Sequence, residues 1–78
     1  MPTVLMVLAF KFCFYSNDHE PMHVHVTKGD CEARVFLVPE VKLDWNRGFK
    51  AQEIKKILML TEKYCDDLKE AWIDYFKK

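Results

Sequence analysis

The chain has 78 residues, enough for one small domain spanning residues 1–78. Half of the residues are hydrophobic and 14% are aromatic, a composition that argues against an intrinsically disordered chain. The 12 basic and 12 acidic side chains cancel, so no long-range field attracts anionic lipid or nucleic acid, and nucleic-acid binding would need a local patch.

The first expected element is a strand over residues 3–15. Val, Leu, Phe and Tyr dominate this segment, and phenylalanine occupies every second position from 10 to 14, which is strand periodicity. A polar run over residues 16–21 ends the strand, because Pro21 forces Glu20 away from helical geometry. The apolar start ends at Lys11 and is too short to span a membrane or to resemble a full signal sequence.

The cysteines bear on the compartment. Cys13, Cys31 and Cys65 are odd in number and widely separated, and no two of them have the spacing of a metal-binding pair. Reduced thiols are the simplest account of this pattern, and we therefore expect a cytoplasmic protein.

A β-hairpin is expected around Gly29 and Asp30. Residues 22–28 alternate between apolar and polar side chains, and a Gly-first two-residue loop is typical of hairpin turns. The resulting register makes one face apolar and the other polar, which is the internal check that it is right. Its cross-strand pairs are Lys28 with Cys31, Thr27 with Glu32, Val26 with Ala33, His25 with Arg34, Val24 with Val35 and His23 with Phe36.

Helical periodicity dominates the last third of the chain. Pro39 breaks the third strand, residues 41–43 form a short fourth strand at an edge, and residues 44–48 are a connection. After it, apolar residues recur every three or four positions, as in an amphipathic helix packed on the apolar sheet face. They are Ile54, Ile57, Leu58, Thr61, Tyr64, Cys65, Leu68, Trp72, Tyr75 and Phe76.

The length of this helix raises a conflict. One helix over residues 50–76 would run about 40 Å, whereas a domain of this size is about 30 Å across. Either the helix breaks near residues 64–66, with Asp67 and Glu70 as a capping box, or its end projects onto another subunit. We expect an α+β fold, an antiparallel sheet of three to four strands covered on one face by a C-terminal helix or helix pair.

All three histidines lie within one short stretch, at His19, His23 and His25. His23 and His25 project from the same strand face, and His19 in the preceding turn completes a three-nitrogen set of the kind that binds a divalent transition metal such as zinc. Arg34, expected beside His25, opposes a bound cation unless Glu32 neutralises its charge. The acidic residues available as a fourth ligand or as a partner of an imidazole are Asp18, Glu20, Asp30 and Glu32.

A second hypothesis is acid–base catalysis. His23 or His25 would act as the general acid or base and Arg34 would hold an anionic group such as a phosphate, as in a phosphodiesterase or ribonuclease. No nucleophile or carboxylate pair accompanies these residues, so the sequence leaves open whether the protein is an enzyme.

The interpretation that we favour is structural or partner-binding. His19 bonds turn backbone, His23 stacks on Phe36, and His25 lies beside Glu32 and Arg34 on a half-exposed sheet face. Such a face, a sheet edge or the C-terminal helix would bind a protein partner or a second copy of the chain.

The segment from His19 to Val26 carries a resemblance to a known family. It meets the pattern His-x-Pro-Pro-His-Phe-His-Val except at Met22 and Val24, which keep an apolar side chain on the buried side. With Met1-Pro2-Thr3-Val4 at the start, the turn at Gly29, Glu32-Ala33 and Trp72 in the terminal helix, the chain resembles the small prokaryotic family catalogued as domain of unknown function 4160.

The resemblance implies little about activity, which is not established for the family. It implies a small intracellular protein that is often encoded beside another small uncharacterised domain, which has prompted toxin–antitoxin or regulatory labels. The sequence therefore favours an interaction or regulatory module acting through a protein partner, in a two-gene cassette of toxin–antitoxin type. The alternative is a metal- or histidine-dependent hydrolase.

Overall fold

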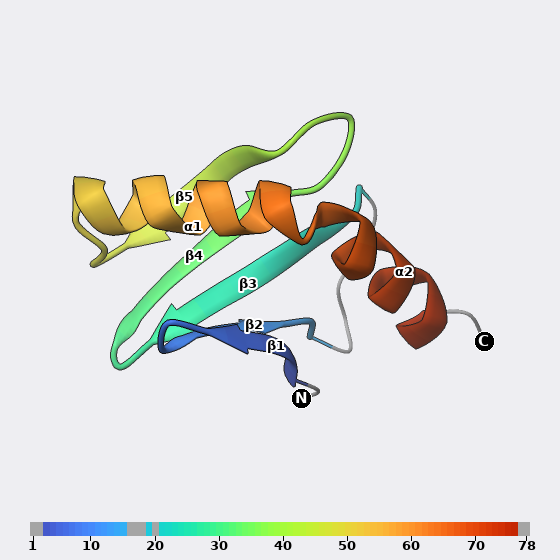
Figure 1. The fold of residues 1–78 in the computed structure, drawn as a ribbon, viewed down its shortest axis with the longest axis horizontal. Helices are drawn as coiled ribbons and strands as arrows, with labels where there is room; N and C mark the ends of the chain where they lie inside the picture. The colour runs from blue at the N-terminus through green and yellow to red at the C-terminus, as the bar shows by residue number, and fades with distance from the viewer. Residues whose placement is uncertain (1–2, 16–18, 20, 77–78) are drawn as a thin grey trace.

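Five strands followed by two helices make up the computed structural model, which describes residues 3–15, 19 and 21–76 (Figure 1). Each strand is antiparallel to its neighbours, in the order β1-β2-β3-β4-β5. The expected α+β fold is confirmed, with more strands than the three or four expected. The strands are Thr3–Val7 (β1), Phe10–Cys13 (β2), His23–Lys28 (β3), Cys31–Phe36 (β4) and Lys42–Arg47 (β5), and the helices are Ala51–Lys63 (α1) and Cys65–Tyr75 (α2).

The expected single strand over residues 3–15 is wrong, because the chain reverses at Leu8 and Ala9. These residues have φ angles of 52° and 70°, and Val7 pairs with Phe10 on either side of them. A two-residue hairpin turn with positive φ at both central positions normally uses Asn or Gly. Leu and Ala give no turn signal, so the hairpin could not be read from local residue preferences.

This turn predicts a stabilising substitution. Ala9→Gly should raise the free energy of unfolding by about 0.5–1 kcal/mol, because glycine removes the left-handed strain at the cost of a more flexible unfolded chain. Urea unfolding followed by circular dichroism measures the change. The matched control is Ala71→Gly inside α2, which should lower stability by about 1 kcal/mol. Destabilisation by both variants would contradict the conformation described for this turn.

The β3–β4 hairpin has the predicted register. Lys28 pairs with Cys31, and the pairing continues to His23 and Phe36 without a shift, so all six predicted pairs are confirmed. Val24 and Val26 are fully buried. His23 and His25 point to the opposite face of the strand.

The fourth predicted strand is longer than expected and includes most of the expected connection. β5 pairs along β4 from Lys42 to Arg47, with an irregularity between the partners of Arg34 and Val35. Leu43 pairs with Val35 and Trp45 pairs with Arg34, so Asp44 is the extra residue of a bulge. Because a one-residue shift changes the face of every later side chain, Trp45 lies on the face opposite Leu43.

The C-terminal segment is a pair of helices, which confirms one of the two alternatives. The break is at Tyr64, where the backbone N–H of Tyr64 donates to Leu60 and that of Leu68 donates to Tyr64. The expected capping box of Asp67 and Glu70 is wrong, since both residues lie inside α2. Backbone hydrogen bonds continue across the break. No side chain caps the start of α2.

The start of α1 is stabilised by a carboxylate. The backbone N–H of Lys50 donates to Glu53 at 3.1 Å, and Lys28 lies 3.5 Å from the same carboxyl group. These contacts lower the pKa of Glu53, and the hydrogen bond from Lys50 has the largest effect. An acidic side chain in the first turn also suits the positive end of the helix dipole.

The helices cover one face of the sheet (Figure 1). Phe12, Phe14 and Leu37 are fully buried on the sheet side, and Ile57 and Leu68 are fully buried on the helix side. Ile57 and Leu68 both belong to the apolar stripe that the sequence predicted for the helices. Among the described residues, neither helix has the length and apolar character needed to cross a membrane.

Candidate functional site

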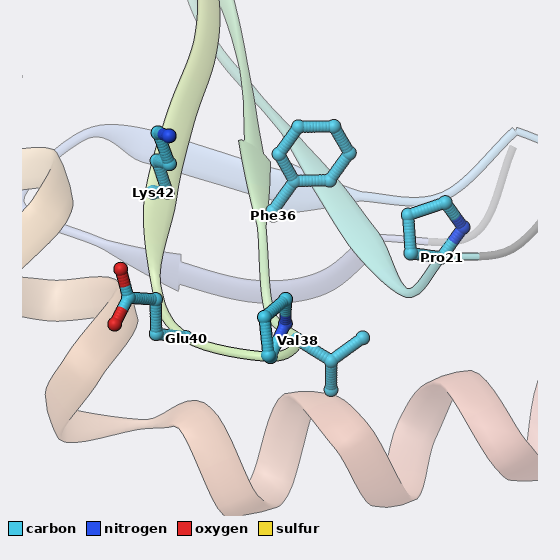
Figure 2. Close-up of a pocket in the computed structure, with 6 residues that line it drawn as sticks. Pro21, Phe36, Val38, Glu40 and Lys42 are labelled. Carbon is cyan, nitrogen blue, oxygen red and sulfur yellow. The ribbon is translucent and has the colours of Figure 1, made fainter.

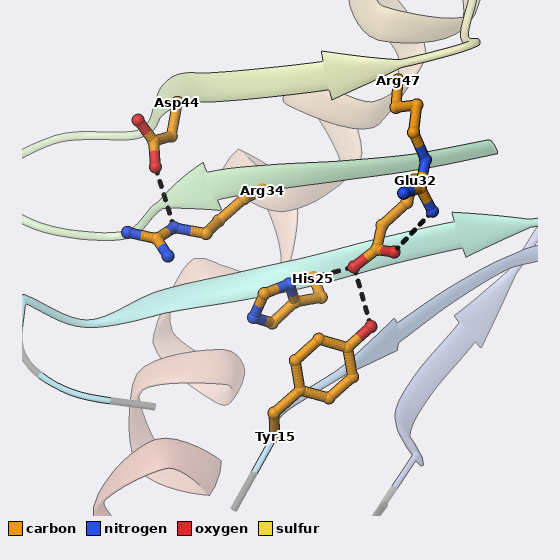
Figure 3. A network of polar contacts seen from close by, with 6 residues as sticks. All are labelled: Tyr15, His25, Glu32, Arg34, Asp44 and Arg47. Carbon is orange, nitrogen blue, oxygen red and sulfur yellow. Dashed lines mark hydrogen bonds and ion pairs between the residues drawn. The ribbon is translucent and has the colours of Figure 1, made fainter. Parts of the chain in front are cut away.

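Polar and aromatic side chains gather on the sheet face opposite the helices, which lie behind the strands in Figure 3. We call this surface the open face. It comprises Tyr15, His25, Glu32, Arg34, Asp44, Trp45 and Arg47.

Glu32 of β4 is the centre of this surface. The Tyr15 hydroxyl donates to Glu32 Oε2 at 2.7 Å, and His25 Nδ1 lies 3.3 Å from the same oxygen (Figure 3). Arg47 Nη2 donates to the other oxygen, Oε1, at 3.3 Å. The carboxylate thus holds an aromatic residue from after β2, an imidazole from β3 and a guanidinium from β5.

His25 is buried between aromatic rings. Its ring centroid lies 4.0 Å from that of Tyr15 and 6.4 Å from that of Trp45. The residue is only 4% exposed. The half-exposed surface expected for this residue is wrong, because the Tyr15 and Trp45 rings lie beside the imidazole.

Arg34 forms the second ion pair of the open face. It is the cross-strand partner of His25, as predicted, but its Nε lies 2.8 Å from Asp44 Oδ2 (Figure 3). Its guanidinium carbon lies 5.8 Å from the ring centroid of Phe36, within the range of a cation–π contact. Asp44 therefore occupies the position at which the hydrolase hypothesis needs an anionic substrate.

His23 is a packed residue at the start of β3. Its Nδ1 donates to the Pro21 carbonyl at 2.8 Å, which fixes the tautomer because a carbonyl can only accept. Its ring lies 5.2 Å from Trp72 and 5.3 Å from His25, and the side chain is 2% exposed. The cross-strand pairing with Phe36 is confirmed, and the His23 ring also lies against the rings of Trp72 and His25.

His19 differs from the other two histidines, since it is exposed in the segment before β3. In the part of the chain that the structure describes, no three His, Cys, Asp or Glu side chains are grouped so that they could hold a metal ion. The predicted set of His19, His23 and His25 is thus not assembled. Two of the acidic residues considered with it, Asp18 and Glu20, lie outside the described residues.

A mostly apolar pocket of about 540 Å³ opens beside the open face (Figure 2). Phe36 ends β4 and Lys42 begins β5, so the pocket lies where these two strands are joined. Lys42 and Glu40 supply opposite charges to its wall. The lining residues are Pro21, Phe36, Val38, Pro39, Glu40 and Lys42.

Sequence reasoning missed four members of the open face. Tyr15 follows Cys13 by two residues, and Cys13 pairs with His25, so its place on this face depends on a strand pairing that the sequence did not predict. Residues 41–46 alternate between apolar and polar side chains, and this strand signal would have extended the predicted strand beyond residue 43. The bulge gave no such signal, so the positions of Asp44, Trp45 and Arg47 on this face were not predictable from the alternation.

Comparison with known proteins gives a family but no described activity. A family model described as Domain of unknown function (DUF4160) matches residues 9–73, which include the histidine segment, the hairpin and most of both helices. No curated protein and no solved structure matches the chain. The chain therefore belongs to the DUF4160 family, which confirms the resemblance seen in its sequence.

Proposed function

We propose that this protein is a small interaction or regulatory module that binds a protein partner through the open face. The observation that carries the proposal is Trp45, which is 38% exposed on a surface where Arg34 and Arg47 are both held by carboxylates. Tryptophan and arginine are the residues that most often dominate binding energy at interfaces. Side chains already fixed in the free protein lose less conformational entropy on binding.

The pocket supports the same function. Phe36 belongs to its wall and also lies against the Arg34 guanidinium, so the pocket and the open face form one continuous surface. A mostly apolar hollow accepts an apolar side chain of a partner, and Lys42 and Glu40 at its wall can orient polar groups beside it. Recognition would thus combine one anchoring side chain with contacts to Trp45.

The family resemblance offers a specific partner. We propose that the chain acts in the cytoplasm with the small protein encoded beside it, as one member of a two-gene cassette of toxin–antitoxin type. The near-complete burial of His23 and His25 supports a binding role for this surface, because neither imidazole is presented to solvent.

The test is a calorimetric titration of the neighbouring protein with the purified chain. Trp45→Ala should weaken the complex by at least about 30-fold, which corresponds to a hot-spot loss of about 2 kcal/mol. The control is Met59→Ala, which removes a 62% exposed methionine on α1, away from the open face. Equal affinities for the wild type and Trp45→Ala, with both variants folded by circular dichroism, would contradict the proposal.

The alternative is a histidine-dependent hydrolase, and one observation favours it. His25 shares the Glu32 carboxylate with the Tyr15 hydroxyl, an arrangement that can orient a general base. Hydrolysis of a simple phosphodiester would need His25 to become accessible. Activity that survives purification and disappears in His25→Gln would support this alternative over the binding module.

A further inference from the structure

The two edges of the sheet differ in chemistry. Among the described residues β1 and β5 are the edge strands, and each presents backbone donors and acceptors on its outer side. Both edge strands have a register irregularity, but β5 also carries Lys42, Asp44 and Arg47, and charged side chains are a feature by which proteins prevent pairing at an edge. β1 reads Thr-Val-Leu-Met-Val and contains no charge.

The apolar character of β1 is exposed. Met6 is 64% exposed and Leu8, in the turn that follows, is 66% exposed. Leu5 and Val7 are partly buried against the core, so they lie on the helix-covered side of the sheet. Met6 pairs with Lys11, and Lys11 pairs with Thr27, which places Met6 on the other side of the sheet.

From this difference we infer that β1 pairs antiparallel with β1 of a second copy of the chain, joining two sheets into one. An antiparallel edge is complementary to itself, because each donor meets an acceptor after a two-fold rotation. A register centred on Met6 places Met6 opposite Met6 of the second copy and Leu5 opposite Val7 of the second copy. Every side chain so paired is uncharged, and alternation between the two faces is kept across the junction.

Charge and size favour a second copy as the occupant. The chain carries 12 basic and 12 acidic side chains, so two copies do not repel at long range. A 78-residue chain has a small core, and pairing at β1 would cover the exposed Met6. A short edge contact buries little area, so we expect a dissociation constant in the micromolar range.

This inference does not rest on the proposed function. β1 and β5 are opposite edges of the sheet, so a dimer formed at β1 leaves Trp45 and the pocket accessible on each copy. Failure of the dimer would not affect the Trp45 experiment, and failure of partner binding would not affect the dimer.

Sedimentation velocity over a wide range of protein concentration tests the dimer. The 9.3 kDa chain should shift to twice that mass as the concentration rises. Met6→Glu should weaken the dimer by at least about tenfold, because it places two carboxylates opposite each other in an apolar contact. Within one chain the new carboxylate faces Lys11, so the fold is expected to persist.

The matched control is Met59→Glu, since Met59 is 62% exposed and lies on α1 between lysines at positions 55 and 63. It should leave the dimerisation constant unchanged. A wild type that stays monomeric throughout, or equal weakening by the two variants, would overturn the inference. Amide hydrogen exchange of the wild type gives a measurement without any variant: exchange in residues 5–7 should slow as concentration rises, and exchange independent of concentration would count against the dimer.

Discussion

Trp72→Ala should remove a large part of the protein's stability. The side chain is 5% exposed, and its ring lies 5.4 Å from Phe14, 5.2 Å from His23 and 4.3 Å from Phe76. Removing a buried tryptophan costs about 3–5 kcal/mol, and a domain of this size has only about 4–12 kcal/mol in total. The loss is large because Trp72 joins α2 both to the core and to the buried His23.

The measurement is thermal unfolding by circular dichroism, in which Trp72→Ala should melt about 12–40 °C below the wild type. The control is Trp45→Ala, which removes the other tryptophan of the chain from a partly exposed site. We expect it to cost about 1 kcal/mol or less. If the two tryptophan variants melt at the same temperature, Trp72 does not have the central packing role that its contacts indicate.

Glu32→Ala should be the most damaging change on the open face. The Glu32 side chain is 16% exposed and accepts from the Tyr15 hydroxyl and from Arg47, with His25 3.3 Å away. Its removal takes a hydrogen-bond acceptor from the partly buried Tyr15 hydroxyl and a charged neighbour from the buried His25 imidazole. We expect a loss of about 3 kcal/mol in the free energy of unfolding.

Urea unfolding of Glu32→Ala beside Glu62→Ala provides the comparison, because Glu62 is an exposed glutamate on α1. Glu62→Ala should change stability by less than about 0.5 kcal/mol. A double-mutant cycle with Tyr15→Phe and Glu32→Ala then measures the coupling between the two side chains, and its coupling energy should be about 1 kcal/mol. A coupling energy of zero would mean that the 2.7 Å hydrogen bond does not stabilise the fold.

Together these substitutions separate the two roles of the aromatic and charged residues. Trp72 and Glu32 act on folding, and Trp45 is expected to act on binding with little effect on folding. Because Glu32 holds Arg47 and His25 in place, its loss should weaken partner binding as well. A stable Trp45→Ala variant that fails to bind is therefore the most direct evidence for the proposed site.

Local sequence was sufficient for the β3–β4 hairpin and for the apolar faces of the helices, but not for the break between the helices at Tyr64. The two-residue loop at Gly29 fixes which residues of β3 and β4 face each other, and alternation between faces follows from strand geometry. The three-to-four-residue spacing likewise fixes which helical residues meet the sheet. These features depend on contacts between neighbours in the chain, and the histidine segment that marked the family is also a local pattern.

Tertiary structure decided the rest. The positive φ angles of Leu8 and Ala9 are opposed by local preference and are held by the pairing of β1 with β2. The bulge at Asp44, which turns Trp45 to the open face, follows from how β5 pairs with β4. His23 and His25 are buried because Trp72 and Tyr15, distant in sequence, pack on them. The sequence by itself thus determined the family, the central hairpin and the helical faces, whereas pairing and packing between distant segments determined whether its histidines meet solvent.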